Sequence, residues 1–180
     1  LMIGNELINQ VTSTKFLGLE IDENLTWKNH IHAILSKISS SNYALRRLKN
    51  TLPHWSKKLL YMASVQSHLI YGLLIWGPMA QSRDINKLFK SQKKSVRLIE
   101  NAPYNAPTDR IFKKHNILKL EDLISQDLCK FMFKFNNKTL PNPIMTLFQA
   151  NNQVHGYNTR GANYARVQHH TSSIYHNSFL

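Results

Sequence analysis

The hydrophobic pattern of residues 1–25 is that of short strands. Between residues 14 and 22 apolar and polar positions alternate, as they do in a strand with one buried face. Residues 2–8 have the pattern of a hairpin whose turn is Gly4-Asn5. Two or three short strands do not make a stable sheet by themselves. We therefore expect the edge of a sheet whose remainder lies upstream.

From Thr26 onward, apolar residues recur at the three- and four-residue spacing of amphipathic helices. Thr26 itself is a suitable N-cap for the first of these helices. The six prolines all fall at junctions between helical segments, where the missing N–H is tolerated. The helices that this pattern predicts span residues 26–48, 56–75, 82–101, 108–115 and 120–136.

The fold class is therefore predicted to be mainly α, in three parts. Residues 1–25 form a small β-hairpin or strand remnant, and residues 26–140 form a helical bundle. Residues 141–180 are rich in Asn, Gln, His, Ser and Tyr, with little apolar periodicity. We expect this third part to be a loosely ordered polar tail, or one that packs against something missing.

The charge of the chain is strongly positive and unevenly distributed. Its 180 residues hold 23 Lys and Arg against 10 Asp and Glu, a formal net charge of +13. The excess positive charge lies between residues 26 and 120. A concentrated positive potential of this kind indicates a polyanionic partner, with nucleic acid as the first candidate and an anionic membrane as the second. The single cysteine excludes an internal disulfide framework. The chain begins with Leu1 rather than Met, which suggests a fragment.

The clearest candidate site is a basic face on the predicted helix 82–101. Five cations recur there at spacings of four and three residues, opposite an apolar face that includes Leu88 and Val96. A solvated helix face is the alternative, but such a face normally mixes both signs of charge. We predict that this basic face contacts nucleic acid. Its members are Arg83, Lys87, Lys90, Lys94 and Arg97.

A second basic patch surrounds Pro53, and the sequence predicts nucleic-acid contact there less strongly. Its cations belong to the end of one predicted helix and the start of the next. A solvated surface explains this patch equally well. The patch consists of Arg46, Arg47, Lys49, Lys57 and Lys58, and its candidate nucleic-acid contacts are Arg46, Arg47, Lys57 and Lys58.

The sequence offers little support for catalysis or for metal binding. Glu20 and Asp22 share a strand face, but turn residues at the start of a helix are the simpler interpretation. His30 and His32 lack the spacing of a same-face helical pair, and no P-loop or dinucleotide-binding glycine motif occurs. Cys129 lies in an apolar helical pattern and is expected to be a buried, inert thiol.

Several strings, in order along nearly the whole chain, resemble non-LTR (LINE-type) retrotransposon reverse transcriptases. Each string is loose alone, whereas their order and spacing together are fairly specific. The strings are Lys15-Phe16-Leu17-Gly18 to Asp22, Leu25-Thr26-Trp27-Lys28 to Ile31, Leu45-Arg46-Arg47-Leu48 to Leu52-Pro53, Leu69-Ile70-Tyr71-Gly72 to Gly77, Leu88-Phe89-Lys90 to Ile99, and Tyr157-Asn158-Thr159-Arg160.

The resemblance implies a role for each part of the chain. Residues 1–25 correspond to the last strands of the palm, in which Phe16, Leu17 and Gly18 take the position of the primer grip. Residues 26–140 correspond to the thumb and connector, and the chain stops inside the tail. The family's polymerase chemistry uses Mg²⁺ held by a Tyr-x-Asp-Asp loop and an earlier Asp. No Asp-Asp pair occurs here, so the chain alone is expected to be inactive and to hold no cofactor.

The expected partners follow from the same resemblance. They are an RNA–DNA or DNA duplex and the upstream palm and fingers region, without a membrane or a small-molecule substrate. The sequence does not give the location; if the locus is expressed, the protein would act inside the cell, in the nucleus or the cytoplasm. Two alternatives stay open: a helical nucleic-acid-binding or interaction protein without enzymatic ancestry at work, and a basic protein that adsorbs to anionic membranes.

Overall fold

The chain is mainly α-helical, as predicted. The computed structural model describes residues 2–3, 6–7, 9–146, 148, 151–154, 157 and 160–161. The strands among these residues are β1 (Met2–Ile3), β2 (Glu6–Leu7), β3 (Ser13–Phe16) and β4 (Leu19–Asp22). The helical segments are α1 (Lys28–Arg47), α2 (His54–Tyr61), η1 (Met62–Gln66), α3 (Ser67–Ile70), α4 (Leu73–Trp76), α5 (Ser82–Glu100), α6 (Asp109–Lys114), α7 (Leu120–Asn136), α8 (Asn142–Met145) and α9 (Asn151–Val154).

The N-terminal strands form two separate antiparallel hairpins. β1 pairs with β2, which confirms the first predicted hairpin; its turn, Gly4-Asn5, lies outside the described residues. The single strand predicted over residues 14–22 is wrong, because β3 and β4 fold back on each other there. Leu17 (φ 45°) and Gly18 (φ 85°) are the two residues between these strands. Two positive φ angles in succession match the twist of a tight hairpin turn, and glycine adopts such an angle without strain.

Asp22 organises the connection from β4 to α1. Its carboxylate accepts hydrogen bonds from the backbone N–H of Thr26 at 2.9 Å and of Trp27 at 2.9 Å, and also from the Thr26 hydroxyl at 3.1 Å. Trp27 adopts the left-handed conformation (φ 61°), and the helix begins at Lys28. Thr26 is therefore not the N-cap that we predicted, since its hydroxyl is bonded to Asp22.

The helix predicted over residues 56–75 is interrupted twice. A π-helical turn, η1, follows Tyr61, and Gly72 (φ 62°) ends α3 and begins α4. The buried residues of this stretch recur every four positions, a spacing that would drift around a regular α-helix of 3.6 residues per turn. The wider π turn keeps them on one face. They include Tyr61, Val65, Leu69 and Leu73, and Trp76 continues their face in α4.

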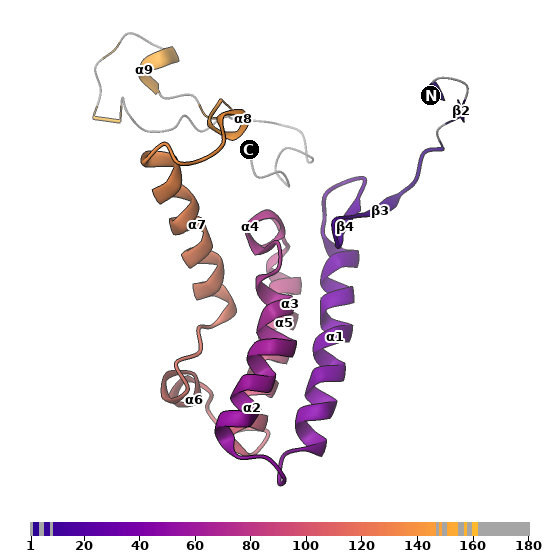
Figure 1. Cartoon of the computed structure of the whole chain (residues 1–180), viewed down its shortest axis with the longest axis vertical. Helices are drawn as coiled ribbons and strands as arrows, with labels where there is room; N and C mark the ends of the chain where they lie inside the picture. The colour runs from indigo at the N-terminus through magenta and orange to yellow at the C-terminus, as the bar shows by residue number, and fades with distance from the viewer. Residues whose placement is uncertain are drawn as a thin grey trace.

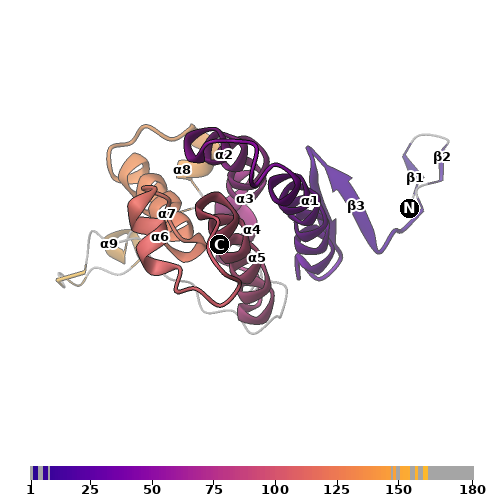
Figure 2. The same ribbon diagram turned by 90° about the horizontal axis from the view of Figure 1, so that it is seen from below.

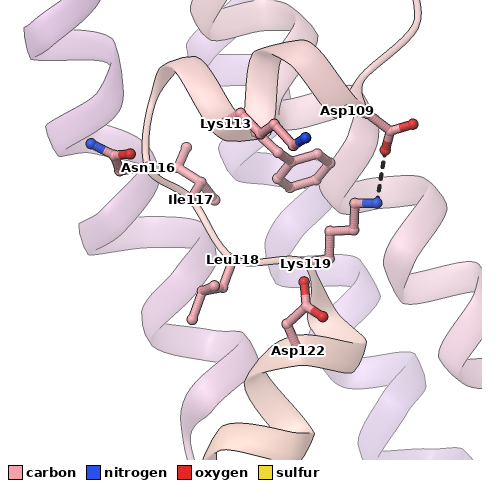
Figure 3. A pocket seen from close by; sticks show the side chains of 8 residues that line it. Asp109, Lys113, Asn116, Ile117, Leu118, Lys119 and Asp122 are labelled. Atoms are coloured by element: carbon pink, nitrogen blue, oxygen red, sulfur yellow. Dashed lines mark ion pairs between the residues drawn. The ribbon is translucent and has the colours of Figure 1, made fainter.

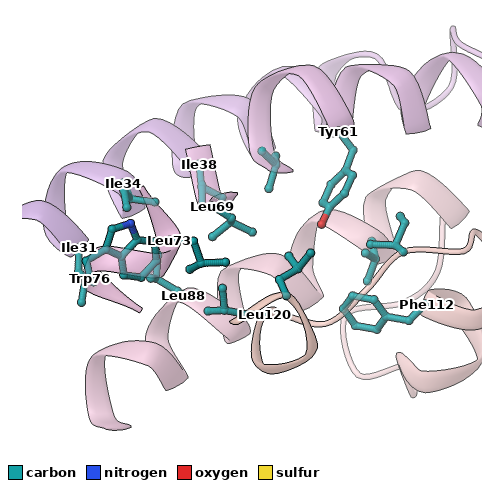
Figure 4. Packing of buried hydrophobic residues seen from close by; sticks show 14 of the residues in the cluster. Ile31, Ile34, Ile38, Tyr61, Leu69, Leu73, Trp76, Leu88, Phe112 and Leu120 are labelled. Atoms are coloured by element: carbon teal, nitrogen blue, oxygen red, sulfur yellow. The ribbon is translucent and has the colours of Figure 1, made fainter. Parts of the chain in front are cut away.

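The helices pack in a bundle around α5, which contacts α1, α2, α6 and α7 (Figures 1 and 2). α1 and α5 run in the same direction, since their first turns line one pocket and Asn42 near the end of α1 bonds to Ser91 and Ser95. Apolar side chains from these helices meet in one core (Figure 4). Its buried members are Leu19, Trp27, Ile31, Ile34, Ile38, Tyr61, Val65, Leu69, Leu73, Trp76, Leu88, Val96, Ile99, Ile111, Phe112, Ile117, Leu120 and Leu123.

A buried polar seam runs along α5 beside this core. The Gln92 amide donates to the Tyr61 hydroxyl at 3.0 Å and to the Leu118 carbonyl at 2.9 Å, and its oxygen accepts from the Leu120 N–H at 3.0 Å. Burial raises the pKa of Tyr61 to about 12 although Gln92 opposes the shift. These bonds tie α5 to α2 and to the start of α7, so the donors and acceptors are satisfied without water. We define the buried polar seam as Asn42, Lys57, Tyr61, Gln92 and Ser95.

The polar tail is described only in part. α8 and α9 are short helices within it, while Asn158 and Thr159 of the last resembling string lie outside the described residues. Among the described residues, no helix combines the length and the apolar character needed to cross a membrane. Cys129 is exposed on α7, so the prediction of a buried thiol is wrong. The reason is that α7 presents that side of its apolar pattern to solvent.

Candidate nucleic-acid interface

The predicted basic face lies on the solvent side of α5. Arg83, Lys87 and Lys90 are exposed, and Lys94 and Arg97 are half-buried. Opposite them, Leu88, Val96 and Ile99 are fully buried. The helical periodicity therefore separates the cations from the core as we predicted.

Most of the basic face lacks an acid partner. Lys87 forms an ion pair with Asp84, its ammonium 2.7 Å from Oδ1. Arg83, Lys90 and Lys94 form no ion pair with any described residue. Arg97 is engaged differently, because its Nε donates to the Ala106 carbonyl at 2.9 Å. Unpaired cations in a row produce a positive potential that attracts a polyanion.

The second basic patch is smaller than the sequence suggested. Arg46 and Arg47 are exposed and Lys58 is half-buried. Lys57, in contrast, is 1% exposed, and its ammonium donates to Asn101 Oδ1 at 2.8 Å and to the Lys49 carbonyl at 3.2 Å. Burial lowers the pKa of Lys57 below its usual 10.5. Lys57 therefore belongs to the buried polar seam and cannot contact a phosphate.

Two exposed aromatic residues lie beside this patch and were not among the site residues predicted from the sequence. Trp55 is 69% exposed on α2, three residues before Lys58, and Tyr43 is 64% exposed on α1, four residues before Arg47. Residues three or four apart are neighbours on a helix surface. Aromatic rings beside cations are the usual platform for stacked bases. The spacing of aromatic and basic residues was the signal that could have found them.

The predicted primer-grip residues form the tip of the β3–β4 hairpin. Phe16 is 62% exposed and Leu17 is 75% exposed. The Tyr71 hydroxyl donates a hydrogen bond to the Leu17 carbonyl, although the two residues are 54 positions apart. A Cβ added to Gly18 would lie 3.3 Å from the Tyr71 ring. The resembling strings at residues 15–22 and 69–77 are thus in direct contact.

Leu19 completes this contact from the strand after the turn. It is buried, and a Cβ added to Gly72 would lie 2.8 Å from Leu19 Cδ2. Glycine at position 72 is therefore needed twice, for its positive φ and for this close approach. The contact fixes the hairpin tip against the helical bundle and leaves two apolar side chains facing outward.

The carboxylates near the hairpin are not arranged for metal binding. Burial alone would raise the pKa of Asp22, but the hydrogen bonds from Thr26, Trp27 and Asn24 lower it below its usual 3.8. The same bonds occupy its oxygens. Nowhere in the described ranges do three or more His, Cys, Asp or Glu side chains gather as a metal site would require. The residues present therefore do not fit the magnesium centre of a polymerase.

The histidines of α1 are separated as their spacing predicted. His30 is buried and its Nδ1 accepts from the Glu20 N–H at 3.4 Å, while His32 is exposed. Burial lowers the pKa of His30 below its usual 6.5. This ring therefore supports the packing of β4 on α1.

A pocket of about 400 Å³ lies between α6 and the start of α7 (Figure 3). Asp109 and Lys119 form an ion pair at 2.8 Å beside it, and Lys113 and Asp122 also line it. Lys119 lowers the pKa of Asp109, and Asp109 raises that of Lys119. Its two acids and two bases balance, so this pocket has no preference for an anion.

Comparison with known proteins identifies relatives among retrotransposon polymerases. The chain is 27% identical over 128 residues to a probable RNA-directed DNA polymerase from transposon BS of Drosophila melanogaster, which covers 69% of this chain and 14% of that protein. It is also 28% identical to the RNA-directed DNA polymerase from mobile element jockey of Drosophila melanogaster, over 74% of this chain and 15% of that protein. The jockey polymerase of Drosophila funebris is likewise 28% identical, over 72% of this chain and 14% of that protein.

The resemblance to non-LTR retrotransposon reverse transcriptases is thereby confirmed. The chain spans about one seventh of the length of the curated relatives that it matches, 14% to 15%. No family model matches the chain, and no solved structure matches it significantly.

Proposed function

We propose that this chain holds the template–primer duplex of a retrotransposon RNA-directed DNA polymerase. The observation that carries the proposal is the basic face of α5, whose cations are exposed or half-buried on one helix and largely lack acid partners. The similarity to three transposon polymerases supplies the class of nucleic acid, a duplex made during reverse transcription.

The geometry of α5 suits a phosphate backbone. From Arg83 to Arg97 the helix extends about 20 Å, at a rise of about 1.5 Å per residue. Five cations along this length follow several consecutive phosphates of one strand. Contacts to phosphate carry no sequence information, so binding is expected to be indifferent to sequence and strongly dependent on salt.

The β3–β4 hairpin is proposed to act as the primer grip, because Phe16 and Leu17 project from a turn that Tyr71 holds in place. In this proposal residues 1–25 belong to the palm, and residues 26–140 to the thumb and connector. The Mg²⁺ ions and their carboxylate ligands would be supplied by other parts of the polymerase. The chain positions nucleic acid and does not itself catalyse nucleotide transfer.

The test is a titration of an RNA–DNA duplex with the full chain at several salt concentrations. Fluorescence anisotropy of the duplex reports binding. The test variant is Lys90→Glu with Lys94→Glu. Its matched control is Lys134→Glu with Lys138→Glu, which makes the same change in net charge at exposed lysines in and after α7. Circular dichroism of each variant verifies the fold.

We expect the α5 variant to bind at least tenfold more weakly than the control, since two phosphate contacts become repulsive. Sequence changes in the duplex should leave the affinity of the wild-type chain unaltered. Absence of binding at low salt, or equal losses in both variants, would overturn the proposal. Retained affinity for one duplex sequence alone would instead favour the alternative of a non-enzymatic helical nucleic-acid-binding protein.

A further inference from the structure

A second pocket, of about 210 Å³, lies between the first turns of α1 and α5. Lys28 from α1 and Arg83 and Lys87 from α5 line it. The first turn of α1 contains no acidic residue, although the Asp22 carboxylate accepts hydrogen bonds from the N–H groups of Thr26 and Trp27 just before it. Because the two helices run in the same direction, the first turns of both lie beside the pocket.

Asp84 is the acidic residue of the pocket lining, and it forms an ion pair with Lys87. The Asp84 side chain is buried, and its Oδ1 accepts the hydrogen bond from the Lys87 ammonium at 2.7 Å. This bond limits the rotamers of Lys87 and keeps its cation at the pocket. With three cations and one carboxylate, the lining stays net positive.

The pocket also has apolar walls. Ile31, which is buried, and Leu35, which is half-buried, line it from α1. Apolar walls lower the local dielectric and strengthen the attraction between the cations and an anion. The balanced pocket between α6 and α7 lacks this net positive charge.

We infer that the pocket between α1 and α5 binds one phosphate group of the nucleic-acid backbone. The inference rests on the proposed function and deepens it. Arg83 and Lys87 belong to the basic face, and Lys28 extends that face across to α1. The arrangement converts a diffuse basic surface into one anchored contact, with a guanidinium and two ammonium groups around the same anion. Lys28 is the residue of this site that sequence reasoning missed.

The test compares two variants of the full chain with equal net charge. The pocket variant is Lys28→Gln with Arg83→Gln, and the control is Lys134→Gln with Lys138→Gln; all four side chains are exposed. Lys87 is left in place because its removal would strand the buried Asp84 carboxylate. The probe is an RNA–DNA duplex without terminal phosphates, so that backbone phosphates alone are available. Thermal unfolding should be the same for both variants.

The pocket variant is expected to bind about tenfold more weakly than the control at low salt. Its slope of log affinity against log salt should be smaller by about 1, the contribution of one phosphate contact. If both variants bind alike while Lys90→Glu with Lys94→Glu still weakens binding, the pocket inference fails and the proposed function stands.

A second probe distinguishes failure of the pocket inference from failure of the proposed function. Inorganic phosphate is titrated into the isotope-labelled chain, and the backbone amide resonances of Asn29 and Lys87 are followed by NMR. Saturable shifts of these amides that the pocket variant lacks support the site, even if the duplex itself does not bind. Unchanged resonances, or equal shifts in the pocket variant, contradict it.

Discussion

Both sides of α5 carry polar groups, yet they differ in how those polar groups are satisfied. On the buried polar seam, Gln92 makes three hydrogen bonds to neighbouring elements and Ser95 donates to Asn42 at 2.7 Å. On the basic face, Lys90 and Lys94 have no ion-pair partner within the described part of the chain. One side joins helices together, and the other faces solvent and is the side that we propose to bind the duplex.

The difference teaches that a cation count does not measure a binding surface. Lys57 and Lys58 are adjacent and equal in the +13 formal charge, but the first is buried and bonded to Asn101 while the second is half-buried at the surface. We expect a lysine in the seam to contribute to stability, and we propose that a lysine on the surface contributes to duplex affinity. Each prediction below tests this division.

The largest effect is expected from Gln92→Leu. The substitution leaves the Leu118 carbonyl, the Leu120 N–H and the Tyr61 hydroxyl without their common partner, and each unsatisfied buried group costs about 1–3 kcal/mol. We expect the free energy of unfolding to fall by about 3 kcal/mol, measured by urea denaturation. Lys90→Gln is the control from the opposite side of α5, and it should change stability by less than about 0.5 kcal/mol. Equal losses of unfolding free energy in the two variants would contradict the distinction between the buried polar seam and the basic face.

An intermediate effect is expected from Lys57→Met, compared with Lys58→Met. The first substitution removes the donor to Asn101 Oδ1 and to the Lys49 carbonyl, so it should lower the free energy of unfolding by about 1–2 kcal/mol. Duplex affinity should stay the same. The second should weaken duplex binding and leave stability nearly unchanged. Urea denaturation and anisotropy on both variants decide the matter, and a loss of affinity in Lys57→Met would contradict the assignment.

The smallest effect concerns Glu100, the acid at the C-terminal end of α5. Its carboxylate pairs with Lys114 and with His115, whose Nε2 lies 2.7 Å from Oε2. The Lys114 hydrogen bond, supported by His115, holds the pKa of Glu100 below its usual 4.5. A carboxyl whose pKa is lower in the folded state stabilises the fold above its unfolded pKa, and this contribution is lost as the pH falls through the folded value.

Glu100→Gln should therefore flatten part of the decline in stability as the pH falls below the usual Glu pKa of 4.5, without changing duplex affinity at neutral pH. Urea denaturation across this range checks the slope. Glu121→Gln, at an exposed position in the first turn of α7, serves as the control. An unchanged acid slope in Glu100→Gln would show that this pair adds nothing to stability.

Periodicity predicted the long helices α1, α5 and α7, because their apolar residues recur at helical spacing. It failed where single residues take positive φ angles. Leu17-Gly18 turned a predicted strand into a hairpin, and Gly72 divided a predicted helix. An alternating pattern is compatible with either outcome, since a two-residue turn preserves the alternation on both sides. The tight approach of Leu19 to Gly72 depends on tertiary packing that periodicity does not contain.

The candidate site was predictable where one helix carries it. The basic face followed from spacing alone, because all five cations belong to α5. The burial of Lys57 was not predictable, since its partner Asn101 is 44 positions away. The same limit hid Lys28, which reaches the basic face only because α1 lies beside α5.

Lysine footprinting of the full chain tests the central claim most directly. Lysines are acetylated with and without an RNA–DNA duplex at low salt, and the modified positions are quantified by mass spectrometry. The account predicts that Lys90 and Lys94 are protected by the duplex, that Lys134 and Lys138 stay reactive, and that the buried Lys57 reacts in neither condition. Unprotected Lys90 and Lys94 in a saturated complex would contradict the account.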